Sequence, residues 1–238
     1  MRVIVLLLLL IAPSARAAEP VDVALLLVSD VSRSIDDSEF ALEKQGYAAA
    51  LISPRFLAAM AEGEHHAVAV AYVEFAGVTE VREVLGWAVL RDAASASDFA
   101  ARLAAAPRSY VGRTAIGEAV AFAQQMLAKG GFAGARQVID VCGDGTSNAG
   151  RPVMEARDAA VAAGITVNGL TIINDHPKNY MFAHVQPPGG LTKYYQDNVI
   201  GGPNAFALEV HDFPGFGAAF MRKLIEEIAL RPVFGQTG

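Results

Sequence analysis

The chain has 238 residues, of which 53% are hydrophobic and 18% are charged. This length suits one α/β domain, and the composition is too apolar for a disordered chain. The formal net charge is −6, and an acidic protein repels polyanions, so we expect no nucleic acid or anionic lipid as a partner. The single cysteine, Cys142, excludes an internal disulfide, and its apolar surroundings predict a buried, inert thiol.

Residues 1–17 have the pattern of a cleaved secretory signal. Arg2 precedes the aliphatic run Val3–Ala12, and an Ala-Arg-Ala cleavage site ends at Ala17. The run is shorter than the ~20 residues that a membrane helix needs, and no other run is long enough, so we expect no membrane span in the mature chain. A retained N-terminal anchor is the alternative. Removal of the signal takes away two basic residues and changes the net charge to −8.

No cysteine lies near the predicted cleavage site, which excludes a lipid-anchored lipoprotein. We therefore expect a periplasmic or secreted protein. The mature chain is predicted to comprise a single domain over residues 21–230, followed by a tail over residues 231–238. No linker, internal repeat or low-complexity segment divides it.

The first half of this domain alternates apolar runs with helical segments. Its first run is almost continuously apolar, which is typical of a parallel strand buried on both faces. Asp36 or Asp37 can cap the following helix, and Pro54 follows that helix. In chain order the predicted elements are a strand at Val21–Ser29, a helix at Ser38–Ile52, strands at Ala67–Phe75 and Thr79–Leu90, and a helix from a cap at Ser97 to Ala105.

The second half continues the alternation. Gly130-Gly131 ends one helix, Pro152 starts the next, and Gly164 closes it. Asn174–Asn204, rich in Gly, Pro and Tyr, is the least regular part. In chain order we predict a loop at Pro107–Arg113, a helix at Thr114–Ala128, a strand at Gln137–Cys142, a helix at Pro152–Ala163, strands at Ile165–Ile173 and Ala205–Val210, and a helix at Phe216–Leu230. Strands that alternate with helices predict a mainly parallel sheet covered on both faces.

Three loops of this arrangement carry hard oxygen ligands. Asp30-Val31-Ser32-Arg33-Ser34 follows the first strand, Gly112-Arg113-Thr114 starts a central helix, and Gly143-Asp144-Gly145 follows the fourth predicted strand. Ligands of open α/β sheets bind beyond the carboxyl ends of the strands, where these loops lie. Two carboxylates and three hydroxyls, with no thiolate or histidine, favour Mg²⁺, Mn²⁺ or Ca²⁺ over zinc or copper. Such a site keeps affinity for one more anionic oxygen, such as a carboxylate of a partner.

These motifs resemble the metal-ion-dependent adhesion site of von Willebrand factor A domains. Asp30, Ser32 and Ser34 match the first motif of that family, Thr114 the second and Asp144 the third, and the resemblance covers nearly the whole mature chain. It implies that the serines bind the metal directly and that the first Asp acts through water. Thr114 and Asp144 would exchange direct and water-mediated roles, and an acidic residue of a partner would complete the shell.

The resemblance also implies a doubly wound sheet with one antiparallel edge strand, here Thr79–Trp87. The stretches Val-Ser-Asp-Val-Ser-Arg-Ser-Ile, Gly-Asp-Gly-Thr-Ser-Asn and Asn-Val-Ile-Gly-Gly-Pro, the last just after Tyr194-Tyr195, are similar to a narrower, DUF1194-like family of exported bacterial proteins of unknown function. One departure is Arg113, where many relatives of the wider family have Gly. Its cation would compete with the metal or contact an acidic ligand.

Simpler interpretations compete with some of these assignments. Asp30 and Asp144 can each be turn residues, although their joint occurrence on correctly placed loops favours a site. Ser147 and Asn148 are expected to be loop or cap residues rather than ligands. The histidines lack the spacing of a metal site, and adjacent His65 and His66 predict a solvated turn. Tyr194 and Tyr195 fit either a cover over the core or an exposed contact surface.

Three possibilities for the function follow, of which the third is a purely structural scaffold with an empty site. The first is a non-enzymatic binding module whose divalent cation engages an acidic side chain of a partner protein. The second is a metal-assisted phosphohydrolase with Asp30 as a phosphoryl-accepting nucleophile. The second class needs an acid/base Asp two residues later, where this chain has Ser32, and the chain has neither a nucleophile elbow nor a phosphate-binding loop.

Overall fold

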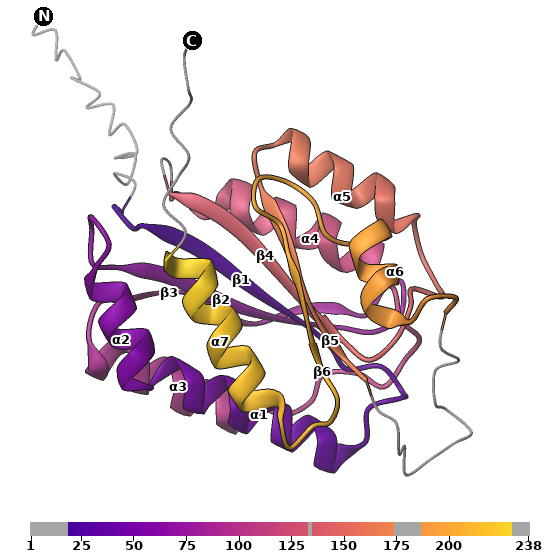
Figure 1. Ribbon diagram of the computed structural model, residues 1–238, viewed down its shortest axis with the longest axis horizontal. Coiled ribbons are helices and arrows are strands. Elements are labelled where there is room, and N and C mark those ends of the chain that lie inside the picture. Colours follow the sequence, from indigo (N-terminus) through magenta and orange to yellow (C-terminus); the bar gives the residue numbers. More distant parts are fainter. Residues whose placement is uncertain (1–18, 133–134, 174–186, 230–238) are drawn as a thin grey trace, which may run out of the picture.

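A six-stranded sheet forms the centre of the molecule, with helices on both of its faces (Figure 1). The computed structural model describes residues 19–132, 135–173 and 187–229. The strands are β1 (Val23–Asp30), β2 (Val68–Phe75), β3 (Val81–Leu90), β4 (Arg136–Gly143), β5 (Thr166–Ile172) and β6 (Ala207–Val210). The helices are α1 (Asp37–Leu51), α2 (Pro54–Ala61), α3 (Ala93–Ala105), α4 (Ile116–Lys129), α5 (Val153–Ala162), α6 (Leu191–Asn198) and α7 (Phe216–Ala229).

The sheet is doubly wound. Its strand order is β3-β2-β1-β4-β5-β6, and every neighbouring pair is parallel except β2 and β3, which are antiparallel. The predicted mostly parallel sheet with one antiparallel edge strand is therefore confirmed. The chain runs outward from β1 to β3 and then returns to start again at β4, so the winding reverses between β1 and β4. Ligand sites of such sheets lie at the carboxyl ends of the strands at this reversal.

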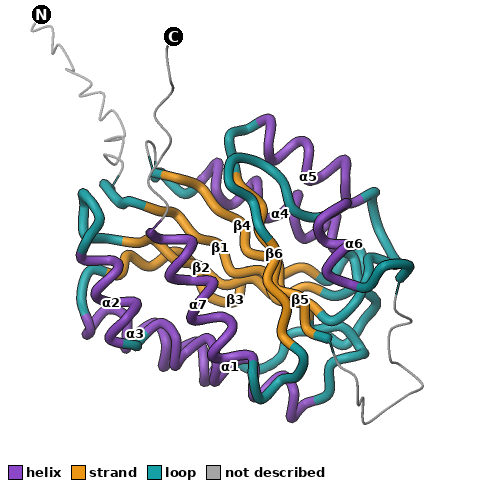
Figure 2. Tube along the Cα trace, viewed as in Figure 1, coloured by secondary structure: helices purple, strands orange, loops and turns teal. Residues whose placement is uncertain are grey.

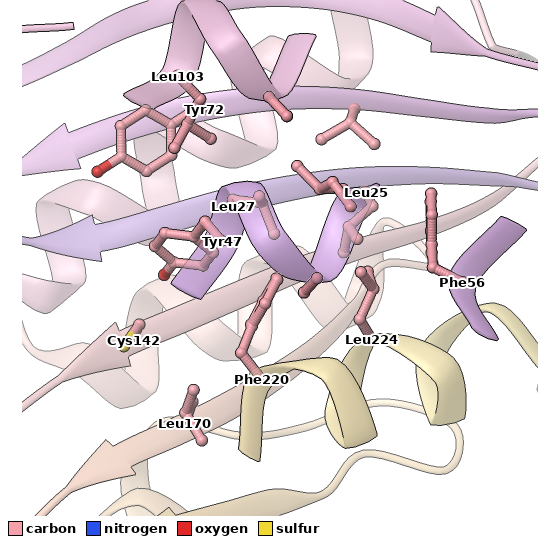
Figure 3. Close-up of a cluster of buried hydrophobic side chains, with 14 of the residues drawn as sticks. Leu25, Leu27, Tyr47, Phe56, Tyr72, Leu103, Cys142, Leu170, Phe220 and Leu224 are labelled. Carbon is pink, nitrogen blue, oxygen red and sulfur yellow. The ribbon is translucent and has the colours of Figure 1, made fainter. Parts of the chain in front are cut away.

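Two hydrophobic layers hold the helices to the sheet. Every residue of β1 is buried, and because side chains alternate along a strand, successive residues enter opposite layers. Leu25 and Leu27 pack with Tyr47 of α1 and Phe220 of α7 in one layer (Figure 3). Leu26 belongs to the other layer, beneath α4, α5 and α6. Figure 2 shows these two groups of helices on either side of the strands.

The structure corrects three expectations about helices. The sequence predicts no helix over the residues of α2, because Pro54 is expected only to follow α1, whereas in the structure Ser53 caps a new helix with Pro54 in its first turn. Helix α3 begins at Ala93 with Asp92 as its cap, so the assignment of Ser97 as the cap is wrong. Helix α6 lies in the segment expected to be least regular.

Other expectations agree with the structure or lie beyond it. Asp36 caps α1, and Cys142 is buried with a free thiol. Within the described ranges, no helix is long and apolar enough to cross a membrane. The segments 1–17 and 231–238 lie outside the described residues, so the secretory signal and the tail stay predictions.

A buried ionic cluster fixes α7 to the sheet. Lys223 of α7 is fully buried, and its Nζ lies 2.5 Å from Oδ1 of Asp140 on β4 and also contacts Glu227 one turn along the helix. Asn168 of β5 donates a hydrogen bond of 2.8 Å to Oε1 of Glu227. Burial, reinforced by the charge of Asp140, raises the pKa of Glu227 to about 7. The Lys223 cation thus compensates the negative charge of two carboxyl groups that are buried away from solvent.

Removal of this cation should destabilise the protein. We expect Lys223→Met to lower the free energy of unfolding by about 3–5 kcal/mol, because it leaves Asp140 and Glu227 buried without a counter-charge. The neighbouring exposed Arg222, replaced by Met, is the matched control and should change stability by less than about 0.5 kcal/mol. Urea denaturation followed by circular dichroism measures both. Equal midpoints for the two variants would contradict a structural role for the cluster.

Candidate metal centre

The five predicted ligand residues come together at the carboxyl end of the sheet. Asp30 is the last residue of β1, and Ser32 and Ser34 lie in the loop between β1 and α1. Thr114 lies two residues before α4, and Asp144 follows the last residue of β4. These two strands flank the reversal of the winding, so the topology places residues from three distant parts of the chain at one point.

A chain of hydrogen bonds links the oxygen atoms of this site. The Ser34 hydroxyl donates to Oδ1 of Asp144 over 2.7 Å, and the hydroxyl oxygens of Ser32 and Ser34 are 3.2 Å apart. The Thr114 hydroxyl donates to Oγ of Ser32 over 3.1 Å. The backbone amide of Ser32 donates to Oδ1 of Asp30 over 2.7 Å. Five oxygen-bearing side chains are therefore neighbours in space, although the chain separates Ser34 from Asp144 by 110 residues.

Asp30 is the least satisfied of these groups. Its side chain is fully buried, and its Oδ2 has no hydrogen-bond partner. Burial raises the pKa of Asp30 well above its ordinary value, and the negative charge of Asp144 raises it further. A buried carboxylate next to a second one costs free energy unless a cation compensates the charge. The residues present therefore fit a cation.

The donor set consists of oxygen atoms alone. Within the described ranges, no group of three or more His, Cys, Asp or Glu side chains is arranged to hold a metal. The site instead combines two carboxylates with three neutral hydroxyls, which suits a hard divalent cation that keeps some of its water. His65 and His66 lie in an exposed turn, as expected, whereas His176 and His184 lie outside the described residues.

Asn148 connects two of the three loops. Its side-chain Oδ1 accepts a hydrogen bond of 3.0 Å from the backbone amide of Thr114, and its backbone amide donates to the Thr114 carbonyl over 2.8 Å. Asn148 is thus the loop residue that was expected. The guanidinium of Arg113 donates to the carbonyl and to Oδ1 of Asn148, and Arg113 is exposed at the rim of the site.

A small open pocket of about 160 Å³ gives access to the hydroxyl groups. Its lining residues are Ser32, Arg33, Ser34, Gly112, Arg113, Thr114 and Asn148. Two of these are arginines, whereas neither Asp30 nor Asp144 is among the lining residues. Such a distribution favours an approaching anion.

Sequence reasoning missed Arg108, which holds the first loop in place. Its Nη2 donates to the carbonyls of both Val31 and Ser32 over 2.8 Å, and its Nη1 pairs with Asp37 at 3.2 Å. A planar guanidinium can serve several acceptors at fixed angles, which a lysine cannot do. In the sequence, Arg108 belongs to no recognisable motif. Only its position in a loop next to the site indicates that it could hold the first loop.

A further buried carboxyl group, Glu43 of α1, lies behind the site. The hydroxyl of Ser29, the residue before Asp30, donates to Oε1 of Glu43. Burial raises the pKa of Glu43 from 4.5 to about 7, against the hydrogen bonds of Ser29 and Tyr47, which lower it. Between these two pH values the folded protein holds more protons at Glu43 than the unfolded chain does. The contribution of Glu43 to stability therefore falls as pH rises through this window.

We expect Glu43→Gln to remove this pH dependence. From pH 5 to pH 8 the wild type should lose about 3 kcal/mol of unfolding free energy through Glu43, and the variant should lose correspondingly less. Urea denaturation at a series of pH values measures the difference. Exposed Glu226, replaced by Gln, is the control and should keep the wild-type slope. A slope unchanged in Glu43→Gln would show that this carboxyl is not the source.

Comparison with protein families gives one match. The family model described as "Protein of unknown function (DUF1194)" matches residues 20–232. None of the curated proteins compared matches the sequence.

Solved structures share the fold at low sequence identity. Proximal thread matrix protein 1 from the mussel byssus, in a structure described as having a zinc-occupied MIDAS motif, is 17% identical, with a TM-score of 0.62 over 88% of this chain and 48% of that chain. The pilus adhesin SpaC from Lactobacillus rhamnosus GG is 13% identical, with a TM-score of 0.60 over 88% and 31%.

A von Willebrand factor type A protein from Catenulispora acidiphila is 17% identical, with a TM-score of 0.56 over 88% of this chain and 42% of that chain. These likenesses show that the chain has the von Willebrand factor A fold. The chain spans about half or less of the length of each of these proteins.

Proposed function

We propose that this chain, which belongs to the family of proteins of unknown function DUF1194, is a metal-ion-dependent binding module that engages an acidic group of a partner. One observation carries the proposal: two carboxylates and three hydroxyls from three separate loops converge, and the buried Oδ2 of Asp30 has no hydrogen-bond partner. Neutral hydroxyls fix the geometry of a cation without cancelling its charge, so the bound ion retains affinity for an external anion.

Asp30, Ser32, Ser34, Thr114 and Asp144 would hold the cation. We propose Mg²⁺, with Mn²⁺ or Ca²⁺ as alternatives, because all five donors are hard oxygens. The mussel protein, described with zinc in its MIDAS motif, supports divalent-cation binding in this fold. It does not decide the metal here, since the two chains share only 17% identity.

The charge of the entrance supports an acidic partner. Arg33 and Arg113 line the pocket together with Ser32, Ser34 and Thr114, and their positive charges would attract an approaching carboxylate. The secretory pattern of residues 1–17 supports a partner in the periplasm or outside the cell.

The alternative function, a metal-assisted phosphohydrolase, finds no additional support in the site. An enzyme of that kind needs a general acid near the nucleophile, and Ser32 occupies the position two residues after Asp30. The mussel matrix protein and the pilus adhesin are not described as enzymes. A screen of the purified protein with phosphatase and esterase substrates in Mg²⁺ distinguishes the two functions, because turnover would favour the enzyme.

Cation binding should be visible as a gain in stability. We expect millimolar Mg²⁺ or Mn²⁺ to raise the melting temperature of the wild type, because the ion binds the folded state alone. Asp30→Asn should abolish this gain. It should not destabilise the metal-free protein, because it removes a buried charge next to Asp144 and keeps an acceptor for the Ser32 amide. Differential scanning calorimetry with and without chelator measures both effects.

The exposed carboxylate of Asp98 on α3 provides the control, since Asp98→Asn should keep the full response to Mg²⁺. A wild-type melting temperature that is insensitive to Mg²⁺, Mn²⁺ and Ca²⁺ would overturn the proposed function.

Partner binding should depend on the same ion. In a pull-down from an envelope extract, we expect the wild type to capture a partner in Mg²⁺ and to release it in excess chelator. Asp144→Ala should capture none under either condition, because it removes the carboxylate that accepts from Ser34. Capture that persists in chelator would argue against an ion-mediated contact.

A further inference from the structure

Helix α6 brings a tyrosine to the back of the candidate metal centre. Leu191, Tyr195 and Val199 recur every four residues and are buried in the layer beneath α4 and α5. This spacing places them on one face of the helix, so α6 is fixed to the sheet through that face. The ring of Tyr195 lies over Gly169 of β5, where an added Cβ would meet its Cδ1 at 2.8 Å.

The hydroxyl of Tyr195 approaches Asp30 across Gly143, the last residue of β4. A Cβ built on Gly143 would lie 2.8 Å from the Tyr195 hydroxyl oxygen and 3.2 Å from Oδ2 of Asp30. Both oxygens therefore lie beside the space that a side chain at residue 143 would fill, and the glycine leaves this space empty. The charge of Asp30 is also, after burial, the largest influence that raises the pKa of Tyr195.

Neither of these two oxygens has a hydrogen-bond partner in the structure. Tyr195 is fully buried and its hydroxyl makes no hydrogen bond, and the same holds for Oδ2 of Asp30. Buried polar atoms are nearly always paired, because an unpaired one costs about 1–3 kcal/mol. A phenol can donate and a carboxylate oxygen can only accept, so the two are chemically complementary.

We propose that Tyr195 is a positioning residue of the metal centre, whose hydroxyl donates to Oδ2 of Asp30 and orients that carboxylate toward the cation. Because the two oxygens are not hydrogen-bonded to each other in the structure, the donation runs through one bridging water molecule, and loss of the phenol oxygen ends it. This inference rests on the proposed function only in its effect on the cation. The proposed link between Tyr195 and Asp30 does not itself require the metal.

The neighbouring tyrosine has a different task. The hydroxyl of Tyr194 accepts a hydrogen bond of 3.2 Å from the amide of Ser147 in the loop after β4. Tyr194 therefore supports the backbone of that loop, whereas the proposed role of Tyr195 is to orient the buried carboxylate of Asp30.

The first test measures Mn²⁺ binding by electron paramagnetic resonance. Tyr195→Phe keeps the ring and removes only the oxygen, and we expect about tenfold weaker binding, as for other residues that orient a metal ligand. Tyr72→Phe is the matched control, because Tyr72 is also fully buried with an unpaired hydroxyl but lies in the opposite layer. Its affinity should stay within twofold of the wild type. Equal affinities for wild type and Tyr195→Phe would overturn the positioning role.

A spectroscopic readout separates positioning from a general loss of structure. Addition of Mg²⁺ should produce a near-ultraviolet tyrosine difference spectrum in the wild type and in Tyr72→Phe, because the Tyr195 hydroxyl senses the changed charge around Asp30. This spectrum should be absent in Tyr195→Phe at saturating Mg²⁺. A full difference spectrum in Tyr195→Phe would count against the proposal.

A double-mutant cycle tests the contact without any metal. In excess chelator, the melting-temperature shifts of Tyr195→Phe and Asp30→Ala should not add up to the shift of the double variant, because each removes one side of the same interaction. Additive shifts would overturn the contact. If the wild type binds no Mn²⁺, the proposed function fails, while the cycle still decides whether Tyr195 contacts Asp30.

Discussion

The mutual repulsion of two buried carboxylates is the constraint around which the carboxyl end of this sheet is organised. Asp30 and Asp144 end neighbouring strands at the point where the winding reverses, and the charge of Asp144 raises the pKa of Asp30 beyond the effect of burial. A protein keeps such an arrangement only when something compensates it. Here the hydroxyls of Ser32, Ser34 and Thr114 lie beside the two carboxylates without adding charge, so the cation proposed above would compensate them.

The loops that carry these groups are held by residues that are not ligands. Arg108 binds the carbonyls of the first loop, Asn148 joins the second loop to the third, and Tyr194 supports the backbone after Asp144. Oxygen ligands in a loop bind a cation well only when their positions are restricted beforehand, because ordering them on binding costs entropy. The site thus depends on a surrounding layer of polar contacts from α6 and from the loop before α4.

The layer beneath α1 and α7 has a different character. It combines large aromatic and aliphatic side chains with buried ionisable groups, namely Glu43 behind Asp30 and the Lys223 cluster that joins α7 to β4 and β5. Burial raises the pKa of both Glu43 and Glu227 to about 7. These groups make the stability of the fold sensitive to pH near neutrality, because a buried carboxyl group is easier to protonate in the folded state than in the unfolded chain.

The sequence by itself determined the fold class and the strands, and it singled out the candidate oxygen ligands. Long apolar runs such as the one that forms β1 are typical of strands in a covered parallel sheet. The motifs around Asp30, Thr114 and Asp144 lie directly after or before such elements, so their place at one edge of the sheet can be predicted. Local chemistry also limited the cap of α1 to Asp36 or Asp37, and the structure shows that it is Asp36. These features could be predicted because each depends on residues that are close in the sequence.

Only the tertiary structure decided the rest. The fold brings together residues that lie far apart in the chain, namely Tyr195 and Asp30 next to Gly143, Arg108 and the loop after β1, and Lys223 and its ionic partners. Helices α2 and α6 were overlooked because each is only eight residues long, and helices of that length have little intrinsic stability and form through packing against the rest of the protein. Their existence, and the roles of the side chains that they place, follow from packing rather than from local pattern.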